Sequence, residues 1–225
     1  MLALSALAPG AHAAGGHASA KPPRIVGAGH LDRTVTVRAQ PRDDARAVKV
    51  LKEFRSEFRP QIVLAISQRS DPQTGKPTWY RISVPGRPNG RTGWIPADAA
   101  TIRPIRQLIH IDRSARTLTL YSNGRVLLKT KVAVGRPGME TPLGLFYVTW
   151  RFVPRAQALG KFAFETSAYS RLSDWPGGGI VGIHGTFAPS LLGQAVSHGC
   201  VRVGNRDILR MRAHVAVGTP IQIVP

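Results

Sequence analysis

Short apolar runs separated by turn residues recur along the chain from residue 31 onward. Residues 34–38 alternate between β-branched and polar positions with the period of two that marks a half-buried strand. Further runs of strand composition lie at residues 47–51, 62–66, 79–84, 92–96, 108–111, 117–121, 126–134 and 145–150. Helical periodicity is confined to residues 206–214. The pattern therefore predicts a mostly all-β protein with little helix.

Turn signals divide these runs into two groups. Asn123-Gly124 stands between two of the strand-like runs and predicts a tight hairpin, because both turn positions need positive φ. Residues 101–106 join the two groups. We predict a leader and linker at residues 1–30, a small β-barrel at residues 31–103, and a β-sandwich or barrel at residues 106–225.

The first twenty residues have features of a secretory signal. Residues 2–8 are apolar, and Ala11-His12-Ala13 fits the small-x-small cleavage pattern, although no positive charge precedes the apolar run. We interpret the segment as an export signal, which would place the mature protein in the cell wall, the periplasm or the extracellular space. A disordered Ala/Gly-rich leader is the alternative. No run approaches about 18 apolar residues, so no transmembrane segment is expected.

The chain is strongly basic, with 31 Lys and Arg against 12 Asp and Glu and a formal net charge of +19 at pH 7. Such a charge favours polyanionic partners. Nucleic acid is not expected, because helix-turn-helix, zinc-finger and aromatic RNA-binding patterns are missing from the sequence. Anionic cell-wall polymers remain a candidate partner, and plain solubility is the alternative explanation.

The chemistry-bearing residues gather in one segment, which holds Cys200, the single cysteine, together with His184 and His198. A thiol beside an imidazole can become a nucleophilic thiolate, and the imidazolium can then protonate a leaving amine. His198 would share a side with Cys200 on an extended strand, whereas His184 needs the fold to approach it, so spacing leaves both open as the base. Gly199 permits a turn that directs backbone N–H groups at an oxyanion. A zinc site from the three residues is conceivable, but no CxxC or HExxH pattern accompanies them, so we expect no metal.

Two stretches resemble known families. The first contains Val37-Arg38 with Pro41, then Trp79-Tyr80-Arg81-Ile82, then Gly93-Trp94-Ile95, and it resembles a bacterial SH3-like domain. The resemblance implies a wall-binding or positioning module, with a structural spacer as the alternative.

The second stretch is residues 106–225, which resemble the YkuD-type L,D-transpeptidases. Two motifs carry most of the resemblance: His184-Gly185-Thr186, and Ser197-His198-Gly199-Cys200-Val201-Arg202. Upstream matches are Ala133-Val134-Gly135 and Thr141-Pro142-Leu143-Gly144, and residues 220–224 look like the closing strand. We interpret Thr141, Pro142 and Gly144 as turn residues without a catalytic role.

By this resemblance Cys200 is the nucleophile, and His184 is the base and then the acid. His198 and Gly199 would shape the oxyanion hole, while Ser197 and Arg202 would support the loop or contact a substrate carboxylate. The backbone carbonyl of Gly185 would orient the imidazole. Residues 151–179 are expected to be irregular, with Tyr169 and Trp175 beside the substrate groove or, alternatively, in the core.

The resemblance implies peptidoglycan cross-linking through a cysteine thioester on stem peptides, without metal or organic cofactor. Carbapenem-type β-lactams are expected as covalent inhibitors. Two alternatives remain open at this stage: an L,D-carboxypeptidase with the same nucleophile, and a non-enzymatic wall-binding protein.

Overall fold

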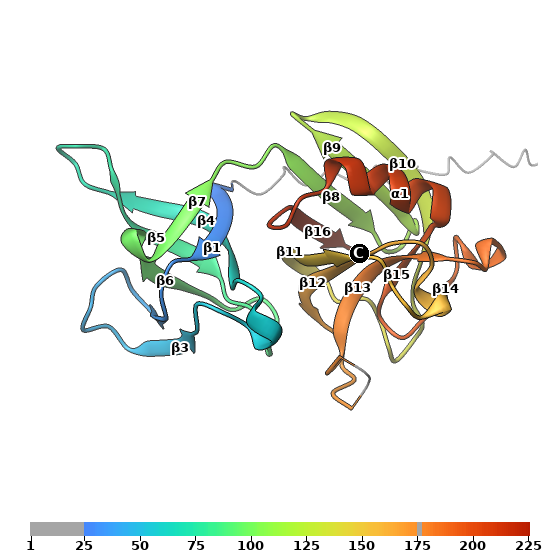
Figure 1. Ribbon diagram of the computed structural model, residues 1–225, viewed down its shortest axis with the longest axis horizontal. Helices are drawn as coiled ribbons and strands as arrows, with labels where there is room; N and C mark the ends of the chain where they lie inside the picture. Colours follow the sequence, from blue (N-terminus) through green and yellow to red (C-terminus); the bar gives the residue numbers. More distant parts are fainter. Residues whose placement is uncertain (1–24, 175–176) are drawn as a thin grey trace, which may run out of the picture.

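A computed structural model describes residues 25–174 and 177–225, and within them the chain forms two β-rich lobes (Figure 1). Residues 1–24, which include the predicted signal-like leader and the start of the predicted linker, lie outside the described residues, as does Trp175. The mostly β architecture expected from the period-two pattern is confirmed. Every helix in the described part falls short of the length and apolar character that a membrane crossing needs.

The N-terminal lobe is a curved antiparallel sheet whose described strands follow the order β3-β2-β6-β5-β4-β1-β7. Its elements are β1 (Gly27–Leu31), β2 (Val35–Arg38), β3 (Ala47–Leu51), η1 (Ser56–Phe58), β4 (Ile62–Ser70), β5 (Pro77–Ser83), β6 (Thr92–Pro96), η2 (Ala97–Ala99) and β7 (Ala100–Arg103). Alternate side chains of these strands point inward and form a core that includes Val37, Val63, Ile82 and Ile95.

Strand β1 occupies part of the segment that the sequence predicted as linker. Gly27 and Gly29 lie on a strand that pairs with β4 and β7. A Cβ at either glycine would collide with the backbone carbonyl oxygen of Arg103 or Thr101. The two glycines therefore allow β7 to approach closely, which replaces the linker that the sequence predicted.

The C-terminal lobe is a larger sheet whose described strands follow the order β14-β10-β15-β13-β12-β11-β16-β8-β9. Its elements are β8 (Gln107–Asp112), β9 (Thr117–Ser122), β10 (Arg125–Gly135), β11 (Gly144–Phe152), η3 (Gln157–Leu159), β12 (Ala163–Tyr169), β13 (Ile180–Thr186), η4 (Pro189–Leu191), β14 (Ala195–Ser197), β15 (Val201–Gly204), α1 (Asn205–His214) and β16 (Pro220–Val224). Strand β10 pairs with β9 in its first half and with β15 and β14 in its second half, so the sheet closes on itself.

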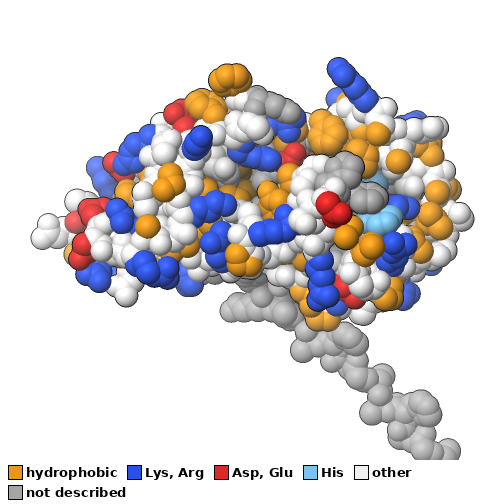
Figure 2. Space-filling view, turned by 90° about the horizontal axis from the view of Figure 1, so that it is seen from below, with side chains coloured by type: hydrophobic (Ala, Val, Ile, Leu, Met, Phe, Trp, Pro, Cys, Tyr) orange, Lys and Arg blue, Asp and Glu red, His pale blue; other side chains and the backbone are white. Residues whose placement is uncertain are grey.

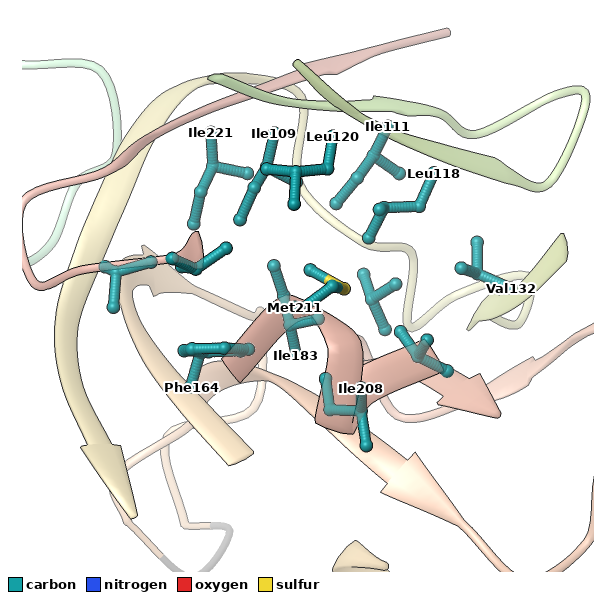
Figure 3. Close-up of a cluster of buried hydrophobic side chains, with 14 of the residues drawn as sticks. Ile109, Ile111, Leu118, Leu120, Val132, Phe164, Ile183, Ile208, Met211 and Ile221 are labelled. Carbon is teal, nitrogen blue, oxygen red and sulfur yellow. The ribbon is translucent and has the colours of Figure 1, made fainter. Parts of the chain in front are cut away.

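Helix α1 packs against the interior of this closed sheet (Figure 3). Ile208 and Met211 point from the helix into the cluster, where they meet strand residues that include Phe164, Ile183 and Ile221. Their spacing of three residues puts both side chains on one face of the helix, as amphipathic packing requires.

Residues 151–179 are more regular than the sequence predicted. They contain β12, which pairs with β11 on one side and β13 on the other. Phe162 and Phe164 pack edge to face with ring centroids 5.3 Å apart and are buried in the core. Because β12 is covered on both faces, its sequence lacks the simple polar alternation that betrays a half-buried strand.

The two lobes are docked through an apolar cluster. The Tyr147 ring of β11 is fully buried there with Ala28 and Leu64, and its hydroxyl donates a hydrogen bond to the carbonyl oxygen of Ile62 at 3.0 Å. A charged contact lies next to this cluster. The Glu165 carboxylate of β12 contacts Arg55 at 2.5 Å and Arg59 at 3.3 Å. The N-terminal lobe is thus held at a defined place beside strands β11 and β12.

Candidate active site

Two parallel strands bring the predicted catalytic residues together. Strand β13 carries His184, and its neighbour β15 begins directly after Cys200. Their register pairs Ile183 with Val201 and His184 with Arg202. Residues 187–196, between the two motifs, therefore form an excursion that returns to the adjacent strand.

The thiol and the imidazole face the same small space above Gly182. The backbone N–H of Gly182 donates a hydrogen bond to Cys200 Sγ at 3.3 Å. A Cβ built on Gly182 would lie 3.9 Å from Cys200 Sγ and 3.8 Å from His184 Cδ2. Because residues 182 and 184 share one face of the strand, the missing side chain at Gly182 leaves room between the two groups.

The ring of His184 is held by its neighbour's backbone. Nδ1 lies 2.8 Å from the carbonyl oxygen of Gly185, and since a carbonyl only accepts, Nδ1 carries the proton. Cδ2, on the opposite ring edge, borders the same space above Gly182 as Cys200 Sγ. In the neutral ring Nε2 is therefore the free acceptor, as a general base requires.

Both groups are uncharged at rest. Burial lowers the pKa of His184, the Gly185 hydrogen bond raises it in part, and the nearby Arg202 guanidinium lowers it again. Burial raises the pKa of the Cys200 thiol above its usual range, although the Gly182 N–H and Arg202 act in the opposite direction. Desolvation thus disfavours a preformed thiolate–imidazolium pair, and the thiol must lose its proton as it attacks.

The turn before Cys200 is anchored by two hydroxyl groups. Ser197 is fully buried, and its hydroxyl accepts the Gly199 N–H at 3.1 Å and donates to the Cys200 carbonyl at 2.5 Å. Thr141 is also fully buried, and its hydroxyl accepts the Gly135 N–H and donates to the Gly199 carbonyl, each at 2.9 Å. The Gly199 N–H is consequently engaged by Ser197, which leaves the N–H of Cys200 as a candidate oxyanion donor.

Thr141 was not recognised from the sequence as part of the site. Replacing it with valine keeps the side-chain shape but leaves the Gly135 N–H and the Gly199 carbonyl buried without a partner. We expect the free energy of unfolding to fall by about 1–3 kcal/mol, because buried polar groups are costly when unpaired. Urea denaturation would measure this loss, with Thr36→Val in the N-terminal lobe as the matched control. An unchanged midpoint in Thr141→Val would contradict the anchoring role.

His198 lies in the turn between β14 and β15, whereas Arg202 lies on β15. Gly199 has a φ of +115°, so the chain turns between His198 and Cys200 and does not continue as a strand. The extended geometry that made His198 an alternative base is therefore absent from this turn. Arg202 is half-buried beside His184, and its Nε is buried without a hydrogen-bond partner among the described residues.

A cleft of about 780 Å³ lies next to the turn. Its walls come from both lobes: Arg87, Pro88, Asn89, Arg113, Glu140, Thr141, Pro142, Leu143, Tyr169, Ser170 and Arg171. Cys200 and His184 are not among them, but Thr141 and Ser170 both contact Gly199. Tyr169 thus lies at a cleft as well as at the end of a core strand. Figure 2 shows Lys and Arg side chains around the hollow between the lobes.

Within residues 25–174 and 177–225, no group of three or more His, Cys, Asp or Glu side chains is placed to hold a metal ion. A thiol and an imidazole that border one space are able to act as a nucleophile and its base.

Comparison with known proteins agrees with this chemistry. Residues 106–223 match the family model of the YkuD L,D-transpeptidase catalytic domain. The chain is 30% identical over 173 residues to a protein named as an L,D-transpeptidase, YkuD, of Bacillus subtilis, covering 77% of this chain and 92% of the relative. A protein of the same name from Bacillus licheniformis is 34% identical over 117 residues, or 52% of this chain and 65% of the relative.

Solved structures similar to this one include an L,D-transpeptidase from Mycobacterium tuberculosis. Its TM-score is 0.49 at 13% identity, and the alignment covers 89% of this chain and 98% of that one. An L,D-transpeptidase from Mycobacterium smegmatis has a TM-score of 0.47 at 17% identity, over 73% of this chain and 90% of that one.

Proposed function

Because this chain belongs to the YkuD-type L,D-transpeptidase family, we propose that it cross-links peptidoglycan stem peptides through a thioester on Cys200. The observation that carries the proposal is the space above Gly182, which Cys200 Sγ and His184 Cδ2 both border. No cofactor is needed, because the acyl group travels on the thiol.

The first half of the reaction forms the acyl-enzyme. Cys200 Sγ attacks the carbonyl carbon between an L-centred residue, such as meso-diaminopimelate, and the terminal D-Ala of a stem tetrapeptide. His184 Nε2 takes the thiol proton during the attack, because both groups are neutral at rest. The Cys200 N–H stabilises the oxyanion. When the C–N bond breaks, His184 returns the proton to the departing D-Ala amine.

The second half transfers the acyl group. An amine of a neighbouring stem peptide attacks the thioester and passes its proton to His184 as the new amide forms. The thiolate leaves and recovers a proton from the imidazolium. If water took the place of the amine, the product would be a shortened stem, which is the carboxypeptidase reaction. A strained β-lactam would acylate the same thiol, so carbapenems are proposed as covalent inhibitors.

The N-terminal segments and the net charge of the chain are consistent with an enzyme that acts on the cell wall. We propose that residues 31–103 are an SH3-like module that positions the catalytic domain, residues 106–225, at the wall. The leader motivates export, and the net charge of +19 suits contact with anionic wall polymers. Wall binding without chemistry is the alternative, and it gives no role to the buried His184 and the thiol that faces it.

Product analysis tests the reaction. Purified full-length protein and a stem tetrapeptide should yield a cross-linked dimer with release of D-Ala, detected by mass spectrometry. Tripeptide without dimer would instead favour the carboxypeptidase, and unchanged tetrapeptide would contradict both enzyme assignments. A pull-down of Cys200→Ala on isolated sacculi measures binding that does not depend on chemistry.

A further inference from the structure

One loop of the N-terminal lobe reaches the cleft in the C-terminal lobe. The connection between β5 and β6 includes Arg87, Pro88 and Asn89, and all three residues line the cleft. This contact joins residues more than eighty positions apart in the sequence. The contacts of Tyr147 and Glu165 hold the two lobes together, so the position of this loop relative to the C-terminal lobe is fixed.

Arg87 holds both legs of the connection between β12 and β13. Its Nη2 donates hydrogen bonds to the carbonyl oxygens of Ser170 and Leu172, each at 2.8 Å. Its Nη1 donates to the carbonyl oxygen of Gly178, also at 2.8 Å. The guanidinium carbon lies 4.8 Å from the centroid of the Tyr169 ring. One planar group therefore ties three carbonyls and an aromatic face together, which a lysine ammonium cannot reproduce.

Asn89 adds a second attachment at the end of β12. Its side-chain amide donates to the Tyr169 carbonyl oxygen at 2.7 Å and accepts the Tyr169 N–H at 3.0 Å. The Asn89 side-chain amide thus makes the same two hydrogen bonds to Tyr169 that the backbone of a paired strand would make. The backbone at Tyr169 and Ser170 is thus held from the N-terminal lobe on two sides.

The held backbone touches the catalytic turn. A Cβ on Gly199 would lie 3.0 Å from Ser170 Cβ, so Ser170 packs directly against Gly199. The next residue is Cys200, whose N–H is the candidate oxyanion donor. On the other side, the Thr141 hydroxyl holds the Gly199 carbonyl. Arg87 consequently supports one of the two surfaces between which the turn is fixed.

We infer that Arg87 is a positioning residue for the acyl transfer, by which the N-terminal lobe shapes the cleft and steadies the Gly199–Cys200 turn. The inference rests on the proposed function for its catalytic consequence, but its structural consequence can be measured without any activity. Loss of Arg87 should release the backbone at Ser170 and widen the range of positions of the Gly199–Cys200 turn, while Cys200 Sγ and His184 keep their places above Gly182.

The test compares Arg87→Ala, Arg87→Lys and the control Arg69→Ala in the full-length protein. Arg69 is exposed on β4 and lies outside the cleft walls, and its loss removes the same charge from the same lobe. Hydrogen exchange at the Ser170 amide, which donates to the Gly179 carbonyl, should become at least about tenfold faster in both Arg87 variants. In the same variants kcat/KM for the stem tetrapeptide should fall by about 10- to 100-fold, because small misplacements are costly. Alkylation of Cys200 by iodoacetamide should change by less than about twofold in them.

Each result supports or overturns the inference. Unchanged exchange at Ser170 in Arg87→Ala would overturn it, whatever the activity. Full recovery of kcat/KM by Arg87→Lys would also overturn it, because a charge alone would then suffice. An inactive wild-type protein would refute the proposed function, whereas faster exchange in the Arg87 variants would still establish the structural role.

Discussion

Cys200→Ala is expected to abolish the covalent adduct between this protein and a carbapenem. The chain contains one cysteine, and its Sγ faces the imidazole of His184 across the space above Gly182. Alanine removes the nucleophile and leaves the Gly182 N–H without its sulfur acceptor, which is a small structural loss. Intact-protein mass spectrometry after incubation would show unmodified protein in the variant and a single adduct in the wild type.

Cys200→Ser is the matched control for this result. It preserves a hydrogen-bond acceptor for the Gly182 N–H, but a hydroxyl is a much weaker nucleophile than a thiol. We expect thermal stability close to that of the wild type and little or no adduct. A carbapenem adduct of the expected mass on Cys200→Ala would contradict the assignment of the nucleophile.

His184→Asn is expected to reduce the rate of acylation by about 10²- to 10⁴-fold. The asparagine amide can still donate to the Gly185 carbonyl, as Nδ1 does, but no base remains at the position of Nε2. Stopped-flow or quenched measurements of carbapenem acylation would give the rate. His30→Asn, at an exposed position of β1, is the control and should leave the rate unchanged. An unchanged rate in His184→Asn would reassign the base.

The same histidine should set the acid limb of the pH profile. Only neutral imidazole can accept the thiol proton, and burial lowers the pKa of His184, so the base stays neutral further into the acid range than an ordinary histidine. The acylation rate should fall only as pH drops through this lowered pKa, and the limb should vanish in His184→Asn. Because the pKa of Cys200 is raised, ionisation of the thiol should not limit the rate near neutral pH.

Much of the fold and the candidate reacting groups could be predicted from the sequence. Short runs of β-branched and apolar residues predicted many of the strands, because residues of these types favour the half-buried positions of a sheet. A lone cysteine in a Ser-His-Gly-Cys context, with His184-Gly185 upstream, indicated the nucleophile and the family. Strand β12 was missed because burial on both faces removes the alternation.

The choice between His184 and His198 could not be made from spacing. It depends on the parallel register of β13 and β15 and on the positive φ of Gly199, which ends the extended path from His198 to Cys200. The register of a strand pair aligns residues that are distant in the sequence. Several registers are compatible with the same pattern of apolar residues, so the pattern does not select one of them. The resemblance to a family pointed to His184, and the arrangement in space supplies the physical reason.

The supports of the turn were decided by the tertiary structure alone. Thr141 and Arg87 act on backbone carbonyls, at Gly199 for one and at Ser170, Leu172 and Gly178 for the other. Every residue has a backbone carbonyl, so the type of the accepting residue gives no sign in the sequence that such a hydrogen bond forms. The thiol and its base were therefore visible in the sequence as side chains, whereas the framework that aims them became visible only when the two lobes were folded against each other.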